Sequence, residues 1–293
     1  MKRCVTFCLS LLLLLALSAS AAAGWFSAPL QSRAVVGADL TEEQLGAVYQ
    51  LFGVQRGTVT ELRLTNAEER LYLQSFVDPA VIGTRSISSV YVEQLASGSG
   101  LDITTHNVTW CSAQMYRNAL TTAGVSDARV VVAAPFEVSG TAALAGVYKA
   151  YEDMTGARLD DAAKLAGTQE LTVTGELAKE LGFLDSSAIV NELKLILNET
   201  AAMSDAQLRE RIRSIAARYR LTLTDSQVDR LAALCRSLEG LDADSLRSRV
   251  EGVQGTLEKL SDARDSAGGF FGGLSRAAEA VASFFAALGS LFG

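Results

Sequence analysis

The spacing of apolar residues changes repeatedly between residues 34 and 156. Alternating or continuous apolar runs predict strands over residues 34–36, 59–64, 86–95, 101–108 and 128–134. Helix-like spacing separates them, with helices expected after Thr41, Asn66, Thr109 and the Ser139–Thr141 segment. We expect Asp78-Pro79 to stop the second of these helices and Ser139 to act as the N-cap of the last. This alternation predicts an α/β domain, a mixed sheet with packed helices, over residues 34–156.

One strand pair is predicted from a turn signal. Gly98-Ser99-Gly100 lies between the strands expected at residues 86–95 and 101–108. Short glycine-containing connections between two strands are typical of β-hairpins. We therefore expect these two strands to be neighbours in the sheet.

From residue 157 onward the pattern is helical. Ser204-Asp205-Ala206-Gln207 and Thr224-Asp225-Ser226-Gln227 have the spacing of capping boxes, as does Thr41-Glu42-Glu43-Gln44 near the start of the chain. Each box precedes an apolar stripe along one helix face. We expect an all-α helical region over residues 157–262, built of antiparallel helices with short loops.

The first 23 residues have the order of a secretory signal peptide. Lys2 and Arg3 precede an apolar core, and small residues follow up to Ala23, where we expect cleavage. The apolar run is shorter than the roughly 20 residues that a membrane-spanning helix needs. The mature protein is therefore expected to be secreted or extracytoplasmic.

The C-terminal end is a Gly-rich linker, residues 263–273, followed by an amphipathic helix over residues 274–293. Apolar residues on one face of this helix are the expected contacts: Leu274, Val281, Phe284, Phe285, Leu288 and Phe292. An apolar face of this size is expected to be buried, and three places remain open. It could pack on its own domain, lie in a membrane interface and hold the protein peripherally at the outer face of the membrane, or bind a partner in the envelope.

Charge and cysteine content narrow the classes of function. The chain has 26 basic and 33 acidic residues, and removal of Lys2 and Arg3 leaves 24 against 33, a net charge of −9. We expect no nucleic-acid binding, because neutralising phosphates requires clustered Lys and Arg. Cys111 and Cys235 are the mature cysteines. Either a disulfide or two buried thiols is compatible with their positions.

Catalytic motifs are weak. His106 is the single histidine, so ligand count excludes a standard zinc site, and we expect no metal and no cofactor. Cys111 near a helix start could have a lowered pKa and pair with His106, but no third orienting group is evident. A packed thiol and a surface imidazole explain the same residues. We therefore assign no catalytic residue.

Two loops are the best candidates for binding a small ligand. Thr84, Arg85 and Ser86 precede a strand, while Ser139, Gly140 and Thr141 follow one and open a helix. Amides at a helix N-terminus, hydroxyl groups and an arginine would suit an anion. Capping, a tight turn and an ion pair of Arg85 explain these residues equally well without a ligand.

The segments VIGTRSISSVYVEQL (residues 81–95) and NVTWCSAQMYRNALTTAGVSDARVVVAAPFEVSGTAALAGVYKAYE (residues 107–152) resemble the YpuA-like secreted bacterial family, domain of unknown function 1002. The resemblance covers roughly residues 34–260. It implies an extracytoplasmic bacterial protein of a Gram-positive-type envelope. It implies no activity and assigns no role to any residue.

Together these patterns favour an envelope-associated binding or interaction protein that is not an enzyme. The alternative is an extracellular hydrolase acting on a cell-wall polymer or peptide. Converging carboxylates in a deep cleft, or Cys111 within hydrogen-bonding reach of His106, would favour the hydrolase.

Overall fold

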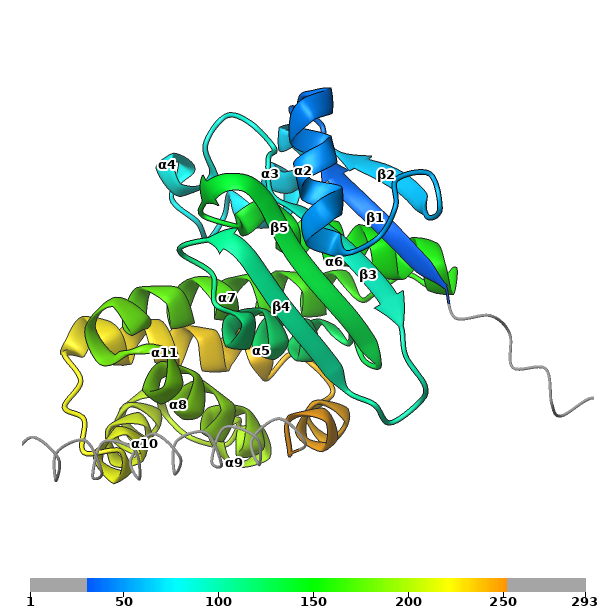
Figure 1. Cartoon of the computed structure of the whole chain (residues 1–293). Coiled ribbons are helices and arrows are strands. Elements are labelled where there is room, and N and C mark those ends of the chain that lie inside the picture. Colours follow the sequence, from blue (N-terminus) through cyan, green and yellow to red (C-terminus); the bar gives the residue numbers. More distant parts are fainter. Residues whose placement is uncertain (1–30, 252–293) are drawn as a thin grey trace, which may run out of the picture. The chain divides into compact units, whose positions relative to one another are not determined.

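A computed structural model describes residues 31–251 of the chain. Its centre is one mixed five-stranded sheet with strand order β2-β1-β3-β5-β4 (Figure 1). The strands are β1 (Ser32–Gly37), β2 (Thr60–Leu64), β3 (Ser89–Gln94), β4 (Leu101–Val108) and β5 (Ala128–Val138). β1 is parallel to β2 and β4 is parallel to β5, while β3 is antiparallel to both β1 and β5. The predicted α/β class is confirmed.

The predicted hairpin is wrong. β3 and β4 are consecutive in the chain, but β5 lies between them and pairs with both. The physical reason is burial. The first part of β5 is apolar and, apart from Arg129, buried, whereas β4 alternates buried or half-buried with exposed positions. An interior place for β5 and an edge place for β4 bury more apolar area than a β3–β4 hairpin would.

β5 also continues beyond its predicted end at Ala134. It passes Pro135 and reaches Val138, where the pairing with β4 becomes irregular between His106 and Val108. A proline has no N–H group to donate to the ladder, so an irregularity is where a strand tolerates one. This extension places the end of β5 beside the start of the next helix.

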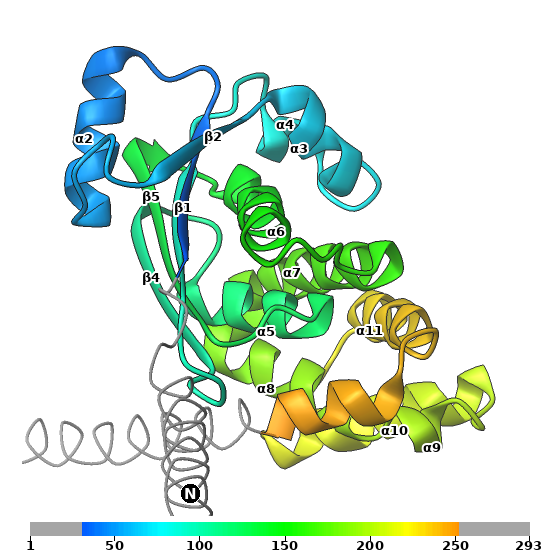
Figure 2. The same cartoon turned by 90° about the vertical axis from the view of Figure 1, so that its right-hand side faces the viewer.

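Helices cover both faces of the sheet (Figure 2). α2 (Glu42–Phe52) packs on one face over an apolar cluster that includes Val36, Tyr91 and Val131. On the other face lie α5 (Ala113–Ala123), α6 (Thr141–Thr155) and, farther from the strands, α7 (Asp161–Leu181). Their cluster includes Val90, Val130 and Leu144. The sheet is therefore buried on both faces.

Helix starts depend on hydrogen bonds between residues that are close in the sequence, and several of them match the prediction to the residue. Capping boxes form at Thr41, Ser204 and Thr224 as expected. Two other starts differ. The N-cap of α3 (Asn66–Leu73) is Thr65, because its hydroxyl pairs reciprocally with Glu68. α5 begins at Ala113 after the Ser112 cap rather than at Thr109, whose amide donates to the Val138 carbonyl at the end of the sheet.

The Asp78-Pro79 pair does not stop α3, which ends earlier, at Leu73. It opens a further short helix, α4 (Pro79–Ile82), with Asp78 as N-cap and Pro79 in the first position. Proline suits that position because the amide it lacks would have no partner inside the helix. α4 then leads into the loop at residues 83–88, which lies on the edge of the pocket described below.

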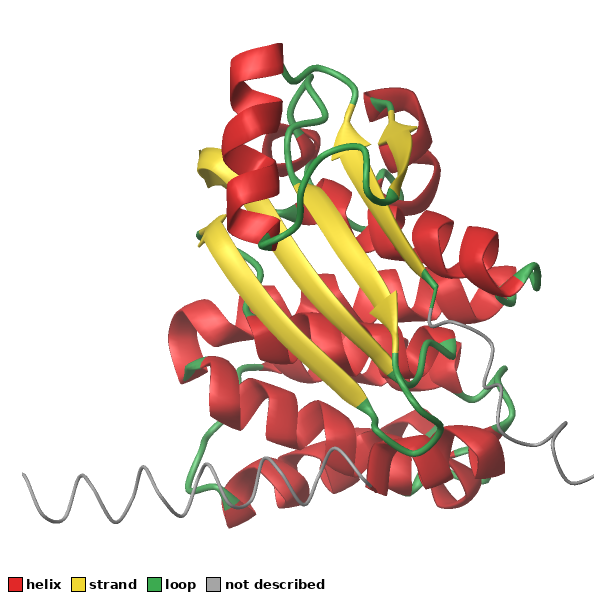
Figure 3. Cartoon of the chain, turned by 45° about the vertical axis from the view of Figure 1, so that its right-hand side comes forward, coloured by secondary structure: helices red, strands yellow, loops and turns green. Residues whose placement is uncertain are grey.

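A second group of helices follows α7, as predicted: α8 (Phe183–Leu195), α9 (Leu197–Thr200), α10 (Asp205–Arg218) and α11 (Asp225–Leu238). They share a second apolar cluster that includes Ile212, Leu231 and Leu234. α7 joins the two parts, because Leu171 belongs to the cluster under the sheet while Leu177 belongs to the second cluster. Figure 3 shows the five strands as one layer, with helices on both sides of it.

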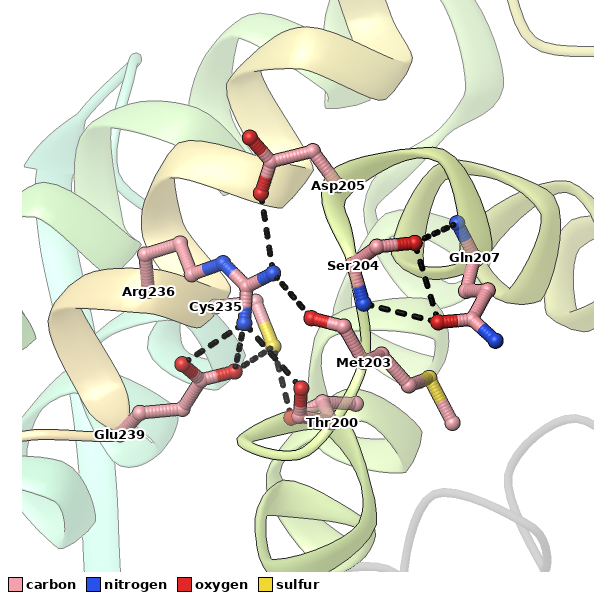
Figure 4. A network of polar contacts seen from close by, with 8 residues as sticks. All are labelled: Thr200, Met203, Ser204, Asp205, Gln207, Cys235, Arg236 and Glu239. Carbon is pink, nitrogen blue, oxygen red and sulfur yellow. Dashed lines mark hydrogen bonds and ion pairs between the residues drawn. The ribbon is translucent and has the colours of Figure 1, made fainter.

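Arg236 ties this helical group together (Figure 4). From α11 its guanidinium donates to the carbonyl oxygens of Thr200 (3.1 Å), the last residue of α9, and of Met203 (2.8 Å), which follows that helix. It also pairs with Asp205 at the start of α10 and with Glu239. One side chain thus satisfies carbonyl groups at the end of one helix while binding the first turn of the next.

Several predictions concern residues outside 31–251: the signal peptide at residues 1–23, the linker at 263–273 and the amphipathic helix at 274–293. The last part of the predicted helical region, residues 252–262, is also outside the described range. Within residues 31–251, no helix combines the length and apolar character needed to cross a bilayer.

Candidate functional site

The two loops singled out in the sequence lie side by side and line one pocket of about 270 Å³. One wall comes from residues 82–88, which run from the last residue of α4 to the residue before β3. The other comes from residues 136–142, which run from the end of β5 into the first turn of α6. Thr84, Arg85, Ser139, Gly140 and Thr141 all line it. The extension of β5 to Val138 brings the second loop close to the first.

Glu69 from α3 forms part of the pocket wall, and its side chain is almost wholly buried. Its Oε1 accepts a hydrogen bond from the Thr141 hydroxyl (2.9 Å), and its Oε2 accepts one from the side-chain amide of Asn66 (3.3 Å). Burial raises the pKa of Glu69 to about 7, although both hydrogen bonds and nearby Arg70 favour the charged form. A carboxyl group that changes charge near neutral pH therefore faces the pocket.

The loop at residues 138–142 is held from several sides. The Ser139 hydroxyl donates to the Val81 carbonyl (3.0 Å), so Ser139 ties the two loops together and is not the predicted N-cap. That position is Gly140, with φ of 93°. A Cβ on Gly140 would lie 2.4 Å from Val108 Cγ1 and 2.6 Å from the Tyr116 hydroxyl, so only glycine fits there.

The start of α6 is capped from outside its own chain segment. The Ala143 amide donates to Ser88 Oγ (3.1 Å), and Ser88 immediately precedes β3. The Glu69 carboxyl group lies at the same helix end, because it accepts a hydrogen bond from the hydroxyl group of Thr141, the first residue of α6. The helix terminus that was expected to hold an external anion is thus already served by groups of the protein.

The remaining predicted residues, Arg85 and Ser86, differ in exposure. Arg85 is exposed at the pocket and forms no ion pair with any residue in the described range. Ser86 is buried, does not line the pocket, and its hydroxyl has no hydrogen-bond partner among the described residues. Its backbone amide donates to Asp39 Oδ2 (2.7 Å), which holds the loop against the end of β1.

The pocket lining also includes apolar residues from both loops. Ile82, Ile87, Phe136 and Val138 contribute to the lining, and Phe136 is unusual among large apolar side chains because 41% of it is exposed. A lining that combines apolar residues with a carboxyl group, hydroxyl groups and an arginine is the usual composition of a small-molecule site.

The cysteine chemistry considered above does not fit the structure. Cys111 and Cys235 are both buried free thiols and form no disulfide. Burial raises the pKa of Cys111 to about 12 and that of Cys235 to about 11, the opposite of an activated thiol. Cys111 precedes the Ser112 cap and lies beside Tyr116, whose hydroxyl donates to the Gly140 carbonyl (2.5 Å).

Paired carboxylates are also missing from this pocket. Glu69 is the one carboxyl group among its lining residues, so the two-carboxylate arrangement of a glycosidase is not formed there by the described residues. Within residues 31–251, no three His, Cys, Asp or Glu side chains gather closely enough to hold a metal ion.

Sequence reasoning missed two residues, Glu69 and Ser88. Glu69 falls four positions before buried Leu73, on the apolar face of α3, and a carboxylate on a buried face was a usable signal. Ser88 gave no such signal, because its bond to α6 joins segments that lie 55 residues apart in the chain.

The fold and pocket thus define an α/β protein with an added group of helices and a small amphipathic pocket at the ends of its strands. The chain belongs to the family described as "Protein of unknown function (DUF1002)", which matches residues 36–254. It is similar to "Uncharacterized protein YpuA" of Bacillus subtilis (strain 168), with 38% identity over 210 residues, 71% of this chain and 72% of that protein. No solved structure matches.

Proposed function

We propose that this protein is an extracytoplasmic, envelope-associated binding protein that takes a small polar ligand in the Glu69 pocket and performs no chemistry on it. The observation that supports this most directly is the convergence of two loops around a buried carboxyl group that has no ion-pair partner within residues 31–251. A buried carboxyl group without a cation is costly, and a ligand that donates to it would remove that cost.

The lining favours particular ligand chemistry. Glu69 calls for a hydrogen-bond donor or an amine, Arg85 for a carboxylate or another acceptor, and Phe136 with Ile82 for an apolar group. A small zwitterionic molecule with an apolar side group meets all three requirements. The expectation of a purely anionic ligand is less suitable, because Glu69 already lies at the helix terminus.

The alternative of a hydrolase has one supporting observation, the pKa of Glu69 near 7, which suits a general acid or base. Hydrolysis would also need a second carboxyl group, or a nucleophile activated by a base. The pocket lining contains no cysteine, histidine, lysine or further acidic residue. Of its hydroxyl groups, that of Ser139 donates to the Val81 carbonyl and that of Thr141 donates to Glu69 itself. Binding without catalysis therefore accounts for more of the site.

The extracytoplasmic location in this proposal is supported by the signal-peptide pattern of residues 1–23, and association with the envelope by the apolar face predicted for residues 274–293. The YpuA-like family membership is compatible with both.

Native mass spectrometry of the mature protein, residues 24–293, purified from its own envelope tests the proposal. We expect a retained small molecule, and we expect Glu69→Gln and Arg85→Ala each to lose most of it. Glu210→Gln, which changes an exposed carboxyl group on α10, is the matched control and should retain it. No retained ligand in the unaltered protein, or equal retention in all three variants, would contradict the proposal.

A further inference from the structure

A second pocket, of about 440 Å³, lies on another part of the protein. Its walls are the turn at residues 98–101 before β4, the α5 side chains Arg117 and Thr121, residues 125–127 before β5, and Ser248 with Arg249. Ser248 and Arg249 belong to a helical stretch at residues 243–251. It shares no lining residue with the Glu69 pocket.

Arg117 is fixed in this pocket without a counterion. Its Nη1 donates to Gln114 Oε1 (2.8 Å) and its Nε donates to the Leu101 carbonyl (3.3 Å). It forms no salt bridge with a carboxylate in residues 31–251, and Asp102 acts on it only from a distance. Both hydrogen-bond partners are neutral, so its positive charge remains uncompensated at short range.

Arg249 is held in a similar way. Its Nε donates to the Ser245 carbonyl (3.2 Å), and its Nη1 lies close to Gly124, where an added Cβ would come within 2.9 Å of it. Like Arg117 it is half-buried and forms no salt bridge with a carboxylate among the described residues, and Asp242 acts on its charge only from a distance. Burial lowers the pKa of both guanidinium groups, so removal from water disfavours their charge, although each stays protonated.

Other arginines show how this chain usually compensates such a charge. Arg213 pairs with Asp225 and Arg236 pairs with Asp205. In both pairs the aspartate side chain is largely exposed to water. Arg117 and Arg249 line one pocket, are half-buried and have no carboxylate partner among the described residues. This is unusual in a protein whose net charge is negative. A bound anion would compensate them with charge-assisted hydrogen bonds.

The rim of the pocket is also defined. Asp127 Oδ1 accepts from the Gly100 amide (2.9 Å), and the Leu95 amide donates to the Asp127 carbonyl (2.6 Å), so the turn at residues 98–100 is held against the start of β5. Asp127 is the one carboxylate in the lining, which leaves a net charge of +1 from two arginines and one aspartate. Three serines, Ser99, Ser126 and Ser248, line the same pocket.

We propose that this second pocket binds a small molecule through an oxyanion, a phosphate or carboxylate group, held by Arg117 and Arg249. The guanidinium fork suits both kinds of group, because its parallel N–H donors match two oxygens of either. The site does not depend on the proposed function of the Glu69 pocket, which has different residues and an acidic group at its wall.

Calorimetric titration of the mature chain, residues 24–293, with inorganic phosphate and separately with malonate tests this proposal at constant ionic strength. We expect saturable binding of at least one of them, with the tighter one identifying the oxyanion. Arg117→Gln and Arg249→Gln are expected to weaken it at least tenfold.

A variant that leaves both arginines in place separates binding from folding. Ser248 is exposed at the pocket, so Ser248→Asp should fold normally and still weaken binding at least tenfold by charge repulsion. Ser214→Asp adds the same charge on exposed α10 and should bind like the unaltered chain. Absence of saturable binding of both anions, or undiminished binding by Ser248→Asp, would overturn the proposal.

Discussion

At the scale of single residues, two buried carboxyl groups are stabilised in different ways. Glu170 accepts from Lys194 Nζ (2.7 Å) and from the Thr122 hydroxyl (2.5 Å), and both charged side chains are fully buried between α7 and α8. Glu69 has hydrogen bonds from Thr141 and Asn66 but no salt bridge within the described residues. The first arrangement fixes a charged pair in the interior, whereas the second leaves a carboxyl group poised to take up a proton.

Glu69 should therefore make stability depend on pH. Its pKa is about 7 in the folded protein against an ordinary 4.5, so between these values the folded chain holds a proton that the unfolded chain has released. This contribution is complete below pH 4.5 and is lost as pH rises through 7. Because one pKa unit corresponds to about 1.4 kcal/mol, the loss is on the order of 3 kcal/mol.

Urea unfolding of Glu69→Gln at pH 5 and pH 8 measures this effect. The free energy of unfolding of the variant, relative to the unaltered protein, should increase by up to about 3 kcal/mol between the two values. Glu210→Gln, at an exposed position, should show no such increase. A difference that stays constant with pH would show that Glu69 is not protonated in the folded state near neutrality.

Lys194→Met should destabilise the protein by about 3–5 kcal/mol, because it leaves the Glu170 charge buried without its cation. The double variant Lys194→Met/Glu170→Leu should lose less, since no charge remains unpaired. Lys179→Met, at an exposed position on α7, should change the free energy of unfolding by less than about 0.5 kcal/mol. Chemical denaturation of the four proteins provides the comparison.

At the scale of elements, the contact between α5 and α7 positions the helical group against the sheet. Gly167 of α7 lies close to the backbone of α5, since a Cβ at this position would be 2.5 Å from the Ala119 carbonyl oxygen and 3.1 Å from the Tyr148 hydroxyl. Thr168 and Thr172 beside it direct their hydroxyl groups to carbonyls one turn earlier in α7. The absence of a side chain at residue 167 lets the backbones meet.

Gly167→Ala should destabilise the protein by about 1–3 kcal/mol, because the added methyl group forces the helices apart. Gly46→Ala is the matched control in α2, where an added Cβ has no atom within 4 Å. The control should stabilise by about 0.5–1 kcal/mol through helix propensity. Thermal unfolding would distinguish the two, and equal effects would contradict the close contact.

At the scale of the whole molecule, the two pockets are separate features of the described residues. The Glu69 pocket lies at the ends of β5 and α4, and the arginine pocket lies at the turn before β4. The apolar helix face predicted at residues 274–293 is a third candidate contact and lies outside the described residues. Under the proposed function, the exported protein would be retained at the envelope through one of these features.

Deleting residues 267–293 should move the protein from the membrane fraction to the soluble extracellular fraction, because the deletion removes the predicted apolar face. Ser283→Ala/Ser290→Ala preserves that face and should remain in the membrane fraction. Unchanged fractionation of the truncated chain would exclude the membrane-interface interpretation of the tail.

What the sequence determined by itself is the α/β class and the starts of three helices. The capping boxes at Thr41, Ser204 and Thr224 depend on hydrogen bonds between residues three positions apart, so local pattern suffices to locate them. The two loops that line the Glu69 pocket were also recognisable, because glycine, hydroxyl and arginine residues stand out against apolar strands. The strand order was not predictable in this way, since the β3–β4 turn signal favoured a hairpin.

Only the tertiary structure decided which distant segments meet. The insertion of β5 between β3 and β4 depends on total apolar burial, which no local segment determines. That insertion brings Ser139 to Val81 and Thr141 to Glu69, across 58 and 72 residues of chain. The raised pKa of Glu69 follows from this packing, because burial changes the energy of a charge while the sequence specifies only that a carboxyl group is present.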